Sequence, residues 1–277
     1  MDSVIDRDRA IAAHYALSGL AEAIHAGLRK LDGAGAPLDL LGAVDEFHMG
    51  GRPATKALAA ALAPAPGAKL LDLGCGIGGT ARWLAAACAI EVEGVDLTPE
   101  FVAVGQALTR ELGLEGQVRL RQGNVLALPF PAESFDAAVM LHVGMNIADK
   151  AALFAEVARV LRPGGRFAVY DVMRLGPGEL SFPLPWAGGP EVSFLATPDD
   201  YRAALVGAGF TVLSEEDRRE MALEMFRAMK RRIAEAGPPP LGLHLVMGKE
   251  AGAKVANLIA GLEAGIFAPV QMIAQRG

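Results

Sequence analysis

A glycine-dense turn is the strongest chemical signal in this 277-residue sequence. It lies within LLDLGCGIGGTARWLA at residues 70–85, where an apolar run carrying Asp72 leads into the glycines and a helical pattern follows them. Gly74, Gly76 and Gly78 have no Cβ, so a ligand can approach the backbone of such a turn closely. The segment also fits the G-x-G-x-x-G pattern of dinucleotide-binding turns, so the turn alone predicts a nucleotide-like ligand without identifying it.

Two carboxylates narrow the choice of ligand. Asp96 ends the next apolar run, VEGVDLTPE, at a position where a carboxylate can accept hydrogen bonds from both hydroxyls of a ribose. S-adenosylmethionine (SAM) and NAD both carry that ribose. Asp72 stands just before the glycine turn, where nicotinamide binders usually have apolar residues. A carboxylate at this position can attract the positively charged methionine part of SAM. We therefore expect SAM as the cofactor.

The elements that must position these residues alternate between short apolar runs and helical patterns from residue 68 onward. This alternation is typical of an α/β fold with a parallel sheet covered on both faces. Helices are predicted between the strands near 79–88, 99–112, 149–161 and 199–209. We expect a Rossmann-like, mostly parallel sheet of seven strands, at 68–74, 91–97, 118–124, 135–141, 166–172, 210–216 and 266–274.

Helical additions surround this core in the sequence. Residues 1–66 are predicted to form an N-terminal helical cap, with a helical pattern over 11–31 and a glycine-ended turn, DEFHMGG, that is a plausible ligand-facing loop. The SAM-binding Rossmann-like core would occupy residues 67–277. Within it we expect a Gly- and Pro-rich lid insertion at 174–197 and a helical insertion at 215–265 that packs on the cap.

Four segments in order resemble the class I SAM-dependent methyltransferases, over roughly residues 45–215. They are LDLGCGIGG, GVDLTPE, RQGNVLALPFPAESFDAAV, and the helix and strand around EVARVLRPGGRFAVYDV. One glycine turn is weak evidence, whereas four ordered elements with correct spacing support one another. The resemblance implies a SAM-binding Rossmann-like domain that transfers a methyl group.

Carried over by position, the resemblance implies a set of cofactor contacts. It places the glycine turn beside the methionine part of SAM, Asp96 on the ribose, and Leu97 against the adenine. Many relatives have Asp where this chain has Asn124, but the amide oxygen can still accept a hydrogen bond. The cofactor-binding residues expected are Asp72, Gly74, Cys75, Gly76, Asp96, Leu97, Asn124, Val125 and Leu141.

A narrower resemblance links FHMGGRPAT and MLHVGMNIADK to the sarcosine and dimethylglycine N-methyltransferases, the phosphoethanolamine methyltransferases and the ubiquinone-pathway C-methyltransferases. In the phosphoethanolamine enzymes the position of His142 carries an Asp, and that of Asn146 carries a catalytic His. Both differ here, so the specificity of those enzymes and their Tyr-His dyad are not transferred.

Acceptor-side candidates follow the strands or lie in the cap. His142 follows the fourth predicted strand, where a neutral imidazole can orient an acceptor or take its proton, although it can instead simply bond to the cap. Tyr15 is the second catalytic candidate, and a core tyrosine is its ordinary alternative. The expected substrate-binding residues are His48, Asn146, Asp171, Arg174 and Trp186, each of which has a turn-stabilising, loop-capping or packing role as its alternative.

Composition restricts the partners and the compartment. Asp and Glu outnumber Lys and Arg by 32 to 26, which argues against a nucleic-acid substrate. The two cysteines, Cys75 and Cys88, form no disulfide framework and indicate a reducing compartment. No signal peptide, membrane-length apolar run or metal-ligand spacing is recognisable. We expect a cytoplasmic monomer or homodimer with no membrane partner and no metal.

The sequence thus predicts a methyltransferase that moves the SAM methyl group to a small-molecule acceptor by direct in-line displacement. An amine nitrogen is the favoured acceptor. A C- or O-methyltransferase of a quinone-like or natural-product ring is one alternative, since only the pocket lining distinguishes them. A non-catalytic SAM-binding module and an NAD-dependent oxidoreductase are alternatives of other classes.

Overall fold

Seven strands form one sheet in the computed structural model, which describes residues 2–15 and 17–277, with side chains from residue 8 onward apart from residue 16. The strand order is β3-β2-β1-β4-β5-β7-β6, and β7 runs antiparallel to both neighbours while the other pairs are parallel. This confirms the predicted Rossmann-like, mostly parallel sheet. The strands are β1 Lys69–Leu73, β2 Glu91–Asp96, β3 Val118–Gln122, β4 Phe135–Leu141, β5 Leu161–Arg174, β6 Phe210–Asp217 and β7 Phe267–Arg276.

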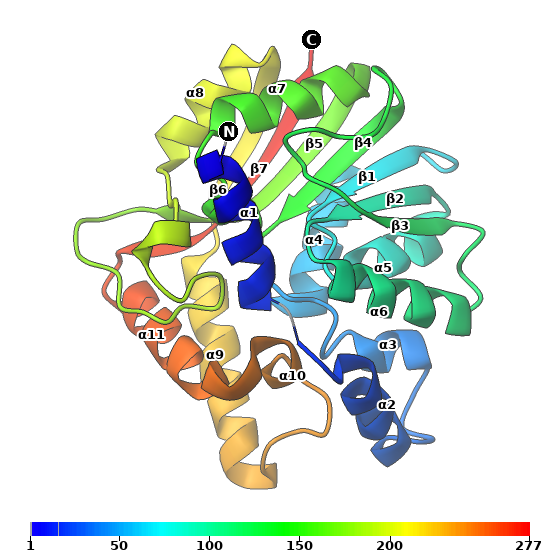
Figure 1. Ribbon diagram of the computed structural model, residues 1–277, viewed down its shortest axis with the longest axis vertical. Coiled ribbons are helices and arrows are strands. Elements are labelled where there is room, and N and C mark those ends of the chain that lie inside the picture. Colours follow the sequence, from blue (N-terminus) through cyan, green and yellow to red (C-terminus); the bar gives the residue numbers. More distant parts are fainter. Residues whose placement is uncertain (1, 16) are drawn as a thin grey trace.

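Helices cover both faces of the sheet and gather beyond its carboxyl edge (Figure 1). Short 3-10 turns are η1 Gly144–Asn146, η2 Pro190–Val192 and η3 Gly248–Glu250. The α-helices are α1 Asp2–Tyr15, α2 Leu20–Lys30, α3 Pro37–Leu41, α4 Gly51–Leu62, α5 Gly79–Cys88, α6 Pro99–Glu111, α7 Lys150–Val160, α8 Pro198–Gly207, α9 Arg219–Ala236, α10 His244–Met247 and α11 Ala251–Glu263.

Alternating side chains of the central strands supply two separate cores. Phe167 and Val169 of β5 pack on the α7 and α8 side, whereas Ala168 and Tyr170 pack on the α4 and α5 side. This follows from the two-residue period of a strand, which sends successive side chains to opposite faces. Apolar residues pack on both faces of the sheet, and this packing holds in place the strand ends that carry the polar side chains of the carboxyl edge.

Local signals fix the ends of several helices. Thr197 and Asp200 form a reciprocal capping box at the start of α8, and Asp149 accepts the Ala152 N–H at the start of α7. Such caps satisfy backbone N–H groups that have no partner within the helix. The predicted helix stop before the Pro-Gly-Gly of residues 163–165 is confirmed, since α7 ends at Val160.

Two predicted boundaries are wrong. The helical pattern over 11–31 is broken, because Gly19 adopts a left-handed φ of 75° between α1 and α2. The helical insertion does not begin at residue 215, because β6 continues to Asp217 and pairs with β7 up to that point. Pairing along β7 overrides the helical propensity of the charged sequence there.

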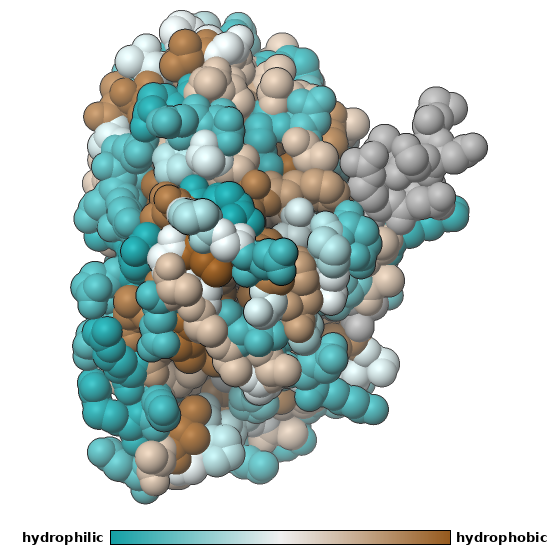
Figure 2. Space-filling model, turned by 90° about the vertical axis from the view of Figure 1, so that its left-hand side faces the viewer, coloured by the Kyte–Doolittle hydropathy of each residue, from teal (hydrophilic) through white to brown (hydrophobic). Residues whose placement is uncertain are grey.

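The additions around the core pack together as predicted. Leu20 and Ile24 of α2 share a buried cluster with Leu241 and Val246, next to and within α10, so the helical insertion contacts the N-terminal cap. The domain boundaries at residues 66 and 67 and the lid role of 174–197 stay predictions. Figure 2 shows mainly polar residues, with smaller apolar areas between them, on the face at the left of Figure 1. None of the described helices combines the length and hydropathy needed to cross a membrane.

Candidate active site

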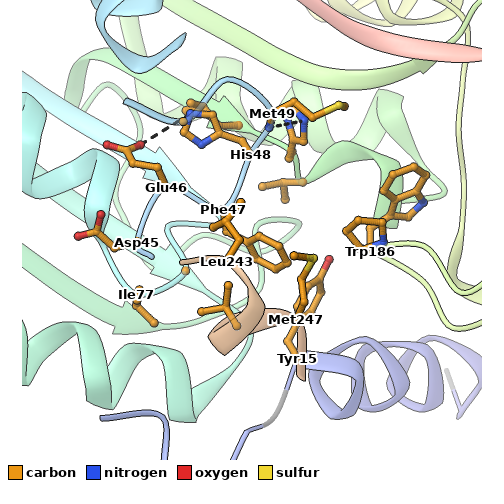
Figure 3. A pocket seen from close by; sticks show the side chains of 18 of the residues that line it. Tyr15, Asp45, Glu46, Phe47, His48, Met49, Ile77, Trp186, Leu243 and Met247 are labelled. Atoms are coloured by element: carbon orange, nitrogen blue, oxygen red, sulfur yellow. Dashed lines mark hydrogen bonds and ion pairs between the residues drawn. The ribbon is translucent and has the colours of Figure 1, made fainter. Parts of the chain in front are cut away.

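One large cavity, of about 1050 Å³, lies where β1, β2 and β4 end. The glycine turn after β1 and the loop at residues 42–50, between α3 and α4, form one wall, and segments of α1, α9, α10 and α11 form the others. Figure 3 shows Tyr15, Phe47, Leu243 and Met247 converging on this space from separate segments. The cavity therefore joins the predicted cofactor residues to the helical additions.

The glycine turn has the open backbone that the sequence predicts. A Cβ on Gly74 would lie 2.3 Å from Val143 Cγ2, so only glycine fits there. Gly76 has a φ of 54° and nothing within 4 Å of its Cβ position, which leaves its backbone open to the cavity. The Gly76 N–H donates to Asp96 Oδ2 at 2.8 Å, so the turn and the end of β2 are held as one unit.

Asp96 is oriented by backbone donors. Its Oδ1 accepts the Thr98 N–H at 2.8 Å and its Oδ2 accepts the Gly76 N–H. A carboxylate oxygen can accept more than one hydrogen bond, so both oxygens keep capacity for the two hydroxyls of a ribose. Burial raises the pKa of Asp96, although these backbone bonds oppose the rise. Leu97, Val125 and Leu141 line the cavity as well.

Asp72 lines the same cavity with a buried oxygen, Oδ2, that has no hydrogen-bond partner among the described residues. Burial, with the Glu46 and Asp96 carboxylates as further causes, raises the pKa of Asp72 to about 8. A buried polar atom without a partner costs free energy, and such atoms are rare outside functional sites. Its position beside the glycine turn fits a ligand that brings a positive charge.

A buried charge network supports the cofactor side of the cavity, and sequence reasoning missed it. Glu46 accepts hydrogen bonds from Thr55 Oγ1 at 2.7 Å and Thr80 Oγ1 at 2.9 Å. Arg82, fully buried in α5, donates to Asp45 Oδ2 at 2.8 Å. Figure 3 shows Asp45 and Glu46 on the 42–50 loop. The DEFHMGG turn was the only signal, and no spacing in it predicts Arg82 as a partner.

The rings of His48, His142 and Tyr170 form a triangle, with the two histidine ring centres 6.0 Å apart. Tyr170 donates its hydroxyl proton to the Met49 carbonyl at 2.9 Å, and its ring centre is 5.9 Å from that of His48 and 5.1 Å from that of His142. His142 Nδ1 donates to the Tyr170 carbonyl at 3.1 Å, and Nε2 accepts the Met49 N–H at 3.3 Å. Burial lowers the pKa of His48 and of His142 to about 3, so both rings are neutral at pH 7.

Tyr15, Asn146 and Trp186 meet in a clasp between distant segments. Tyr15 donates to Asn146 Oδ1 at 3.0 Å, and Asn146 Nδ2 donates to the carbonyls of Trp186 at 2.8 Å and Val192 at 2.9 Å. Nearby, His14 Nε2 donates to the Pro185 carbonyl at 3.0 Å. Asn146 therefore joins α1, the end of the fourth strand and the 174–197 insertion at the cavity wall.

Asn124 lies in the lining near the end of β3. Its Oδ1 accepts the Leu126 N–H and its Nδ2 donates to Asp8 of α1, both at 2.8 Å. The amide oxygen that was predicted to face an adenine thus also caps the following turn. Asp8 in the middle of α1 contacts Asn124 and Tyr15 at its end contacts Asn146, so the second half of the helix lies along the cavity wall.

Asp171 and Arg174 of β5 do not line the cavity. Asp171 accepts the Tyr201 hydroxyl at 2.7 Å in the core on the α8 side, where burial raises its pKa to about 6. Arg174 donates to the carbonyls of Gly176 and Gly178. In this arrangement both residues stabilise the structure around the site instead of facing an acceptor.

The far wall of the cavity is apolar and comes from helices that carried no motif. We name this part the outer chamber and define it by the lining residues of α9 to α11 and the segments between them. The helical spacing of the Met and Phe residues in α9 was the available signal. The main members are Met225, Phe226, Met229, Leu243, Val246, Met247, Val255 and Leu258.

These features match what SAM requires. The open glycine backbone accommodates a closely bound group, the Asp96 carboxylate suits a ribose, and the unpaired Asp72 oxygen suits a cation. A SAM-sized molecule fits at this end of the cavity with room left over, since sites for small molecules of that size take roughly 300–1,000 Å³.

Comparisons with known proteins agree. Residues 71–169 match the family model described as a methyltransferase domain. The methyltransferase GfsG of Streptomyces halstedii is 33% identical over 133 residues, which cover 48% of each chain. The chain spans about half the length of the first curated relatives it matches. Other relatives are named as O-methyltransferases and sterol C-methyltransferases.

Solved structures show the same fold at low identity. A geranyl diphosphate C-methyltransferase from Streptomyces coelicolor A3(2), crystallised with S-adenosyl-L-homocysteine, is 20% identical with a TM-score of 0.70, covering 98% of each chain. A sarcosine dimethylglycine methyltransferase structure from Galdieria sulphuraria is 22% identical with a TM-score of 0.66, covering 81% of this chain and 85% of that one. This chain therefore carries a methyltransferase domain over residues 71–169, in the fold of the class I SAM-dependent methyltransferases.

Proposed function

We propose that the protein transfers the methyl group of SAM to a small acceptor with an apolar skeleton. One observation carries the proposal: a single cavity runs from the glycine turn and its two carboxylates to the apolar outer chamber. A cofactor bound at the first end and an acceptor in the second would therefore meet inside one cavity.

The residues at the cofactor end have separate tasks in this proposal. Gly74 and Gly76 let the methionine part approach the backbone, Asp72 faces its positive charge, and Asp96 accepts the ribose hydroxyls. Leu97, Val125 and Leu141 supply apolar contact. SAM, when bound there, supplies an electrophilic methyl group.

The remaining task of the chain is to orient the acceptor and exclude water, which is how bound reactants gain most of their rate in such displacements. Tyr15 and His142 stay the predicted catalytic residues. The Tyr15 hydroxyl proton is engaged by Asn146, so its oxygen can only accept from an acceptor. The Nε2 lone pair of neutral His142 contacts the Met49 N–H at 3.3 Å, a long bond that an acceptor hydroxyl or amine could replace.

The methylated atom is the finer part of the proposal. The sequence favours an amine nitrogen, and relatives with names that specify carbon or oxygen keep those alternatives open. The lining supports the apolar skeleton directly, since the outer chamber is formed by Met, Phe, Leu and Val side chains. Apolar groups leaving water for such a chamber gain about 25 cal/mol for each Å² buried.

The test is methyl transfer from SAM labelled in its methyl group to matched acceptors. We would compare decylamine, 4-decylphenol and farnesol with their short-chain counterparts methylamine, phenol and prenol. Labelled product from at least one long-chain acceptor, with kcat/KM at least tenfold above its short counterpart, supports the proposal. SAM binding without turnover on a broad acceptor pool would instead favour a non-catalytic SAM-binding module.

A further inference from the structure

The charges of the cavity are distributed unevenly. The acidic side chains in its lining come from α1, the 42–50 loop, the ends of β1 and β2, and the start of α7. Those on the 42–50 loop are bound to Arg82, Arg52, Thr55 and Thr80. The outer chamber has no acidic side chain among its described lining residues. Its polar lining side chains are Arg232 and His244.

Arg232 lies on the cavity face of α9. Met225 and Met229 line the outer chamber, and Arg232 follows Met229 by three residues, so the three side chains lie along one stripe of the helix. Arg232 is exposed at the end of this stripe, near the α9 terminus at Ala236. A long molecule with one end between the methionines would have its other end beside the guanidinium.

The neighbouring arginines of α9 differ in their partners. Arg227 forms ion pairs with Glu220 and Glu224, and Arg231 forms one with Glu224 at 3.2 Å. Neither of them lines the cavity. Arg232 has no ion pair among the described residues, and Glu235, three residues later, does not reach it. Among the described lining residues of the outer chamber, its guanidinium is therefore the one charged group that is free to bind a ligand.

We propose that the acceptor is an amphiphile whose apolar chain fills the outer chamber and whose terminal oxyanion, a carboxylate or a phosphate, binds Arg232. This inference rests on the proposed function and names its substrate class. A guanidinium presents several N–H donors in one plane and matches two oxygens of either anion. His244 is the other polar side chain of the outer chamber, and its imidazole can also donate an N–H. The apolar lining contributes affinity, while Arg232 selects the charge of the acceptor.

The test is calorimetric titration of the protein, saturated with S-adenosylhomocysteine, with four ligands of equal chain length. Decanoate and decyl phosphate carry oxyanions, decan-1-ol is neutral and decylammonium is cationic. We expect both anions to bind at least tenfold more tightly than the alcohol, and the cation to bind no more tightly than the alcohol. Exposed guanidinium groups are screened by solvent, so the preference should shrink as ionic strength rises.

Two charge-reversal variants distinguish direct binding of the ligand by Arg232 from the effect of the protein's overall charge. Arg232→Glu and Arg231→Glu change the net charge equally and stand side by side on α9, but only Arg232 lines the cavity. We expect Arg232→Glu to abolish the preference for anions and Arg231→Glu to keep at least half of it. Equal effects of the two variants, equal affinity for all four ligands, or no binding of any of them would overturn the inference.

Failure of the proposed function has a different signature. If S-adenosylhomocysteine does not bind, or no acceptor is methylated, the proposed function fails whatever the charge preference. If methyl transfer is found but decanoate and decyl phosphate have no advantage that depends on Arg232, only the inference fails.

Discussion

The unpaired oxygen of Asp72 links cofactor binding to pH. The pKa of the buried carboxyl lies at about 8, well above the ordinary 3.8, so at neutral pH the free protein holds Asp72 mostly protonated. A cation bound beside it favours the ionised form. The affinity for a positively charged ligand should therefore increase as pH rises toward the pKa and level off above it.

Asp72→Asn should remove this dependence. We expect the affinity of the wild-type protein for SAM to rise between about pH 6 and pH 8, whereas the variant binds SAM about tenfold more weakly at pH 8.5 without that rise. Calorimetric titration over pH measures both. The amino group of SAM titrates in the same pH range, so the effect of Asp72 is the difference between the affinities of the two proteins at each pH. Identical dependence of SAM affinity on pH in the two proteins would contradict the role of Asp72.

The same shift has a consequence for stability. An unfolded Asp loses its proton near 3.8 and the folded Asp72 near 8, so between these values the folded state binds more protons. The free energy of unfolding therefore decreases as pH rises through that window, because the folded protein must either keep a proton that the unfolded chain releases or bury an ionised carboxylate. Thermal unfolding of Asp72→Asn should show a smaller loss of stability between about pH 5 and pH 8 than wild type does.

His142 occupies a left-handed backbone position, with a φ of 55°. His142→Asn removes the imidazole and suits this conformation better than alanine does. We expect kcat to fall about 100-fold, the usual range for loss of an acid–base or orienting group, with SAM affinity changed less than threefold. An unchanged kcat would rule out a catalytic role. Because the pKa of His142 lies at about 3, a fall of the wild-type rate near that pH that the variant lacks supports a base. A rate that falls equally at every pH supports positioning.

At the scale of elements, Asn146 holds α1 against the 174–197 insertion. Asn146→Leu would leave the Tyr15 hydroxyl and the Trp186 and Val192 carbonyls without this partner. Each buried polar group left unpaired costs about 1–3 kcal/mol. We expect amide hydrogen exchange in residues 9–15 to accelerate at least tenfold, and KM for the acceptor to rise more than the Kd for SAM.

Asn257→Leu is a matched control for this clasp. Asn257 also donates to a carbonyl of the insertion, that of Pro183 at 3.0 Å, but it does not line the cavity and makes no hydrogen bond to the described side chains of α1. The variant should leave exchange in residues 9–15 at the wild-type rate. If Asn257→Leu accelerates that exchange as much as Asn146→Leu does, the clasp is not specific to Asn146.

Across the whole molecule, the residues predicted to bind the cofactor all line the cavity, whereas two of those predicted to bind the acceptor, Asp171 and Arg174, do not. Asp72, the glycines and Asp96 lie within 25 residues in ordered elements, so spacing along the chain fixes their spacing in the sheet. The clasp joins Tyr15 to a residue 131 positions away, and Asp45 meets Arg82 across 37. No local pattern encodes such contacts, because tertiary packing of helices with similar apolar faces determines them.

The geometry of the strands explains two of the differences from the predictions, at residues 215–217 and at Asp171. Residues 215–217 carry helix-favouring acidic residues, yet pairing with β7 makes them strand. Asp171 follows the pattern of an edge residue on β5, but its side chain turns to Tyr201 on the α8 side. Successive side chains of a strand point to opposite faces of the sheet. A residue at the carboxyl edge therefore reaches the cavity only if its side chain points to the cavity side.

The most direct test of the central claim is cofactor selectivity. Purified protein would be titrated calorimetrically with SAM, S-adenosylhomocysteine and NAD, and the titrations repeated with Asp96→Ala after thermal unfolding confirms that the variant is folded. We expect binding of the first two, no binding of NAD, and at least a 100-fold loss of affinity in Asp96→Ala, since a ribose loses both of its acceptor oxygens. Binding of NAD alone would contradict the assignment.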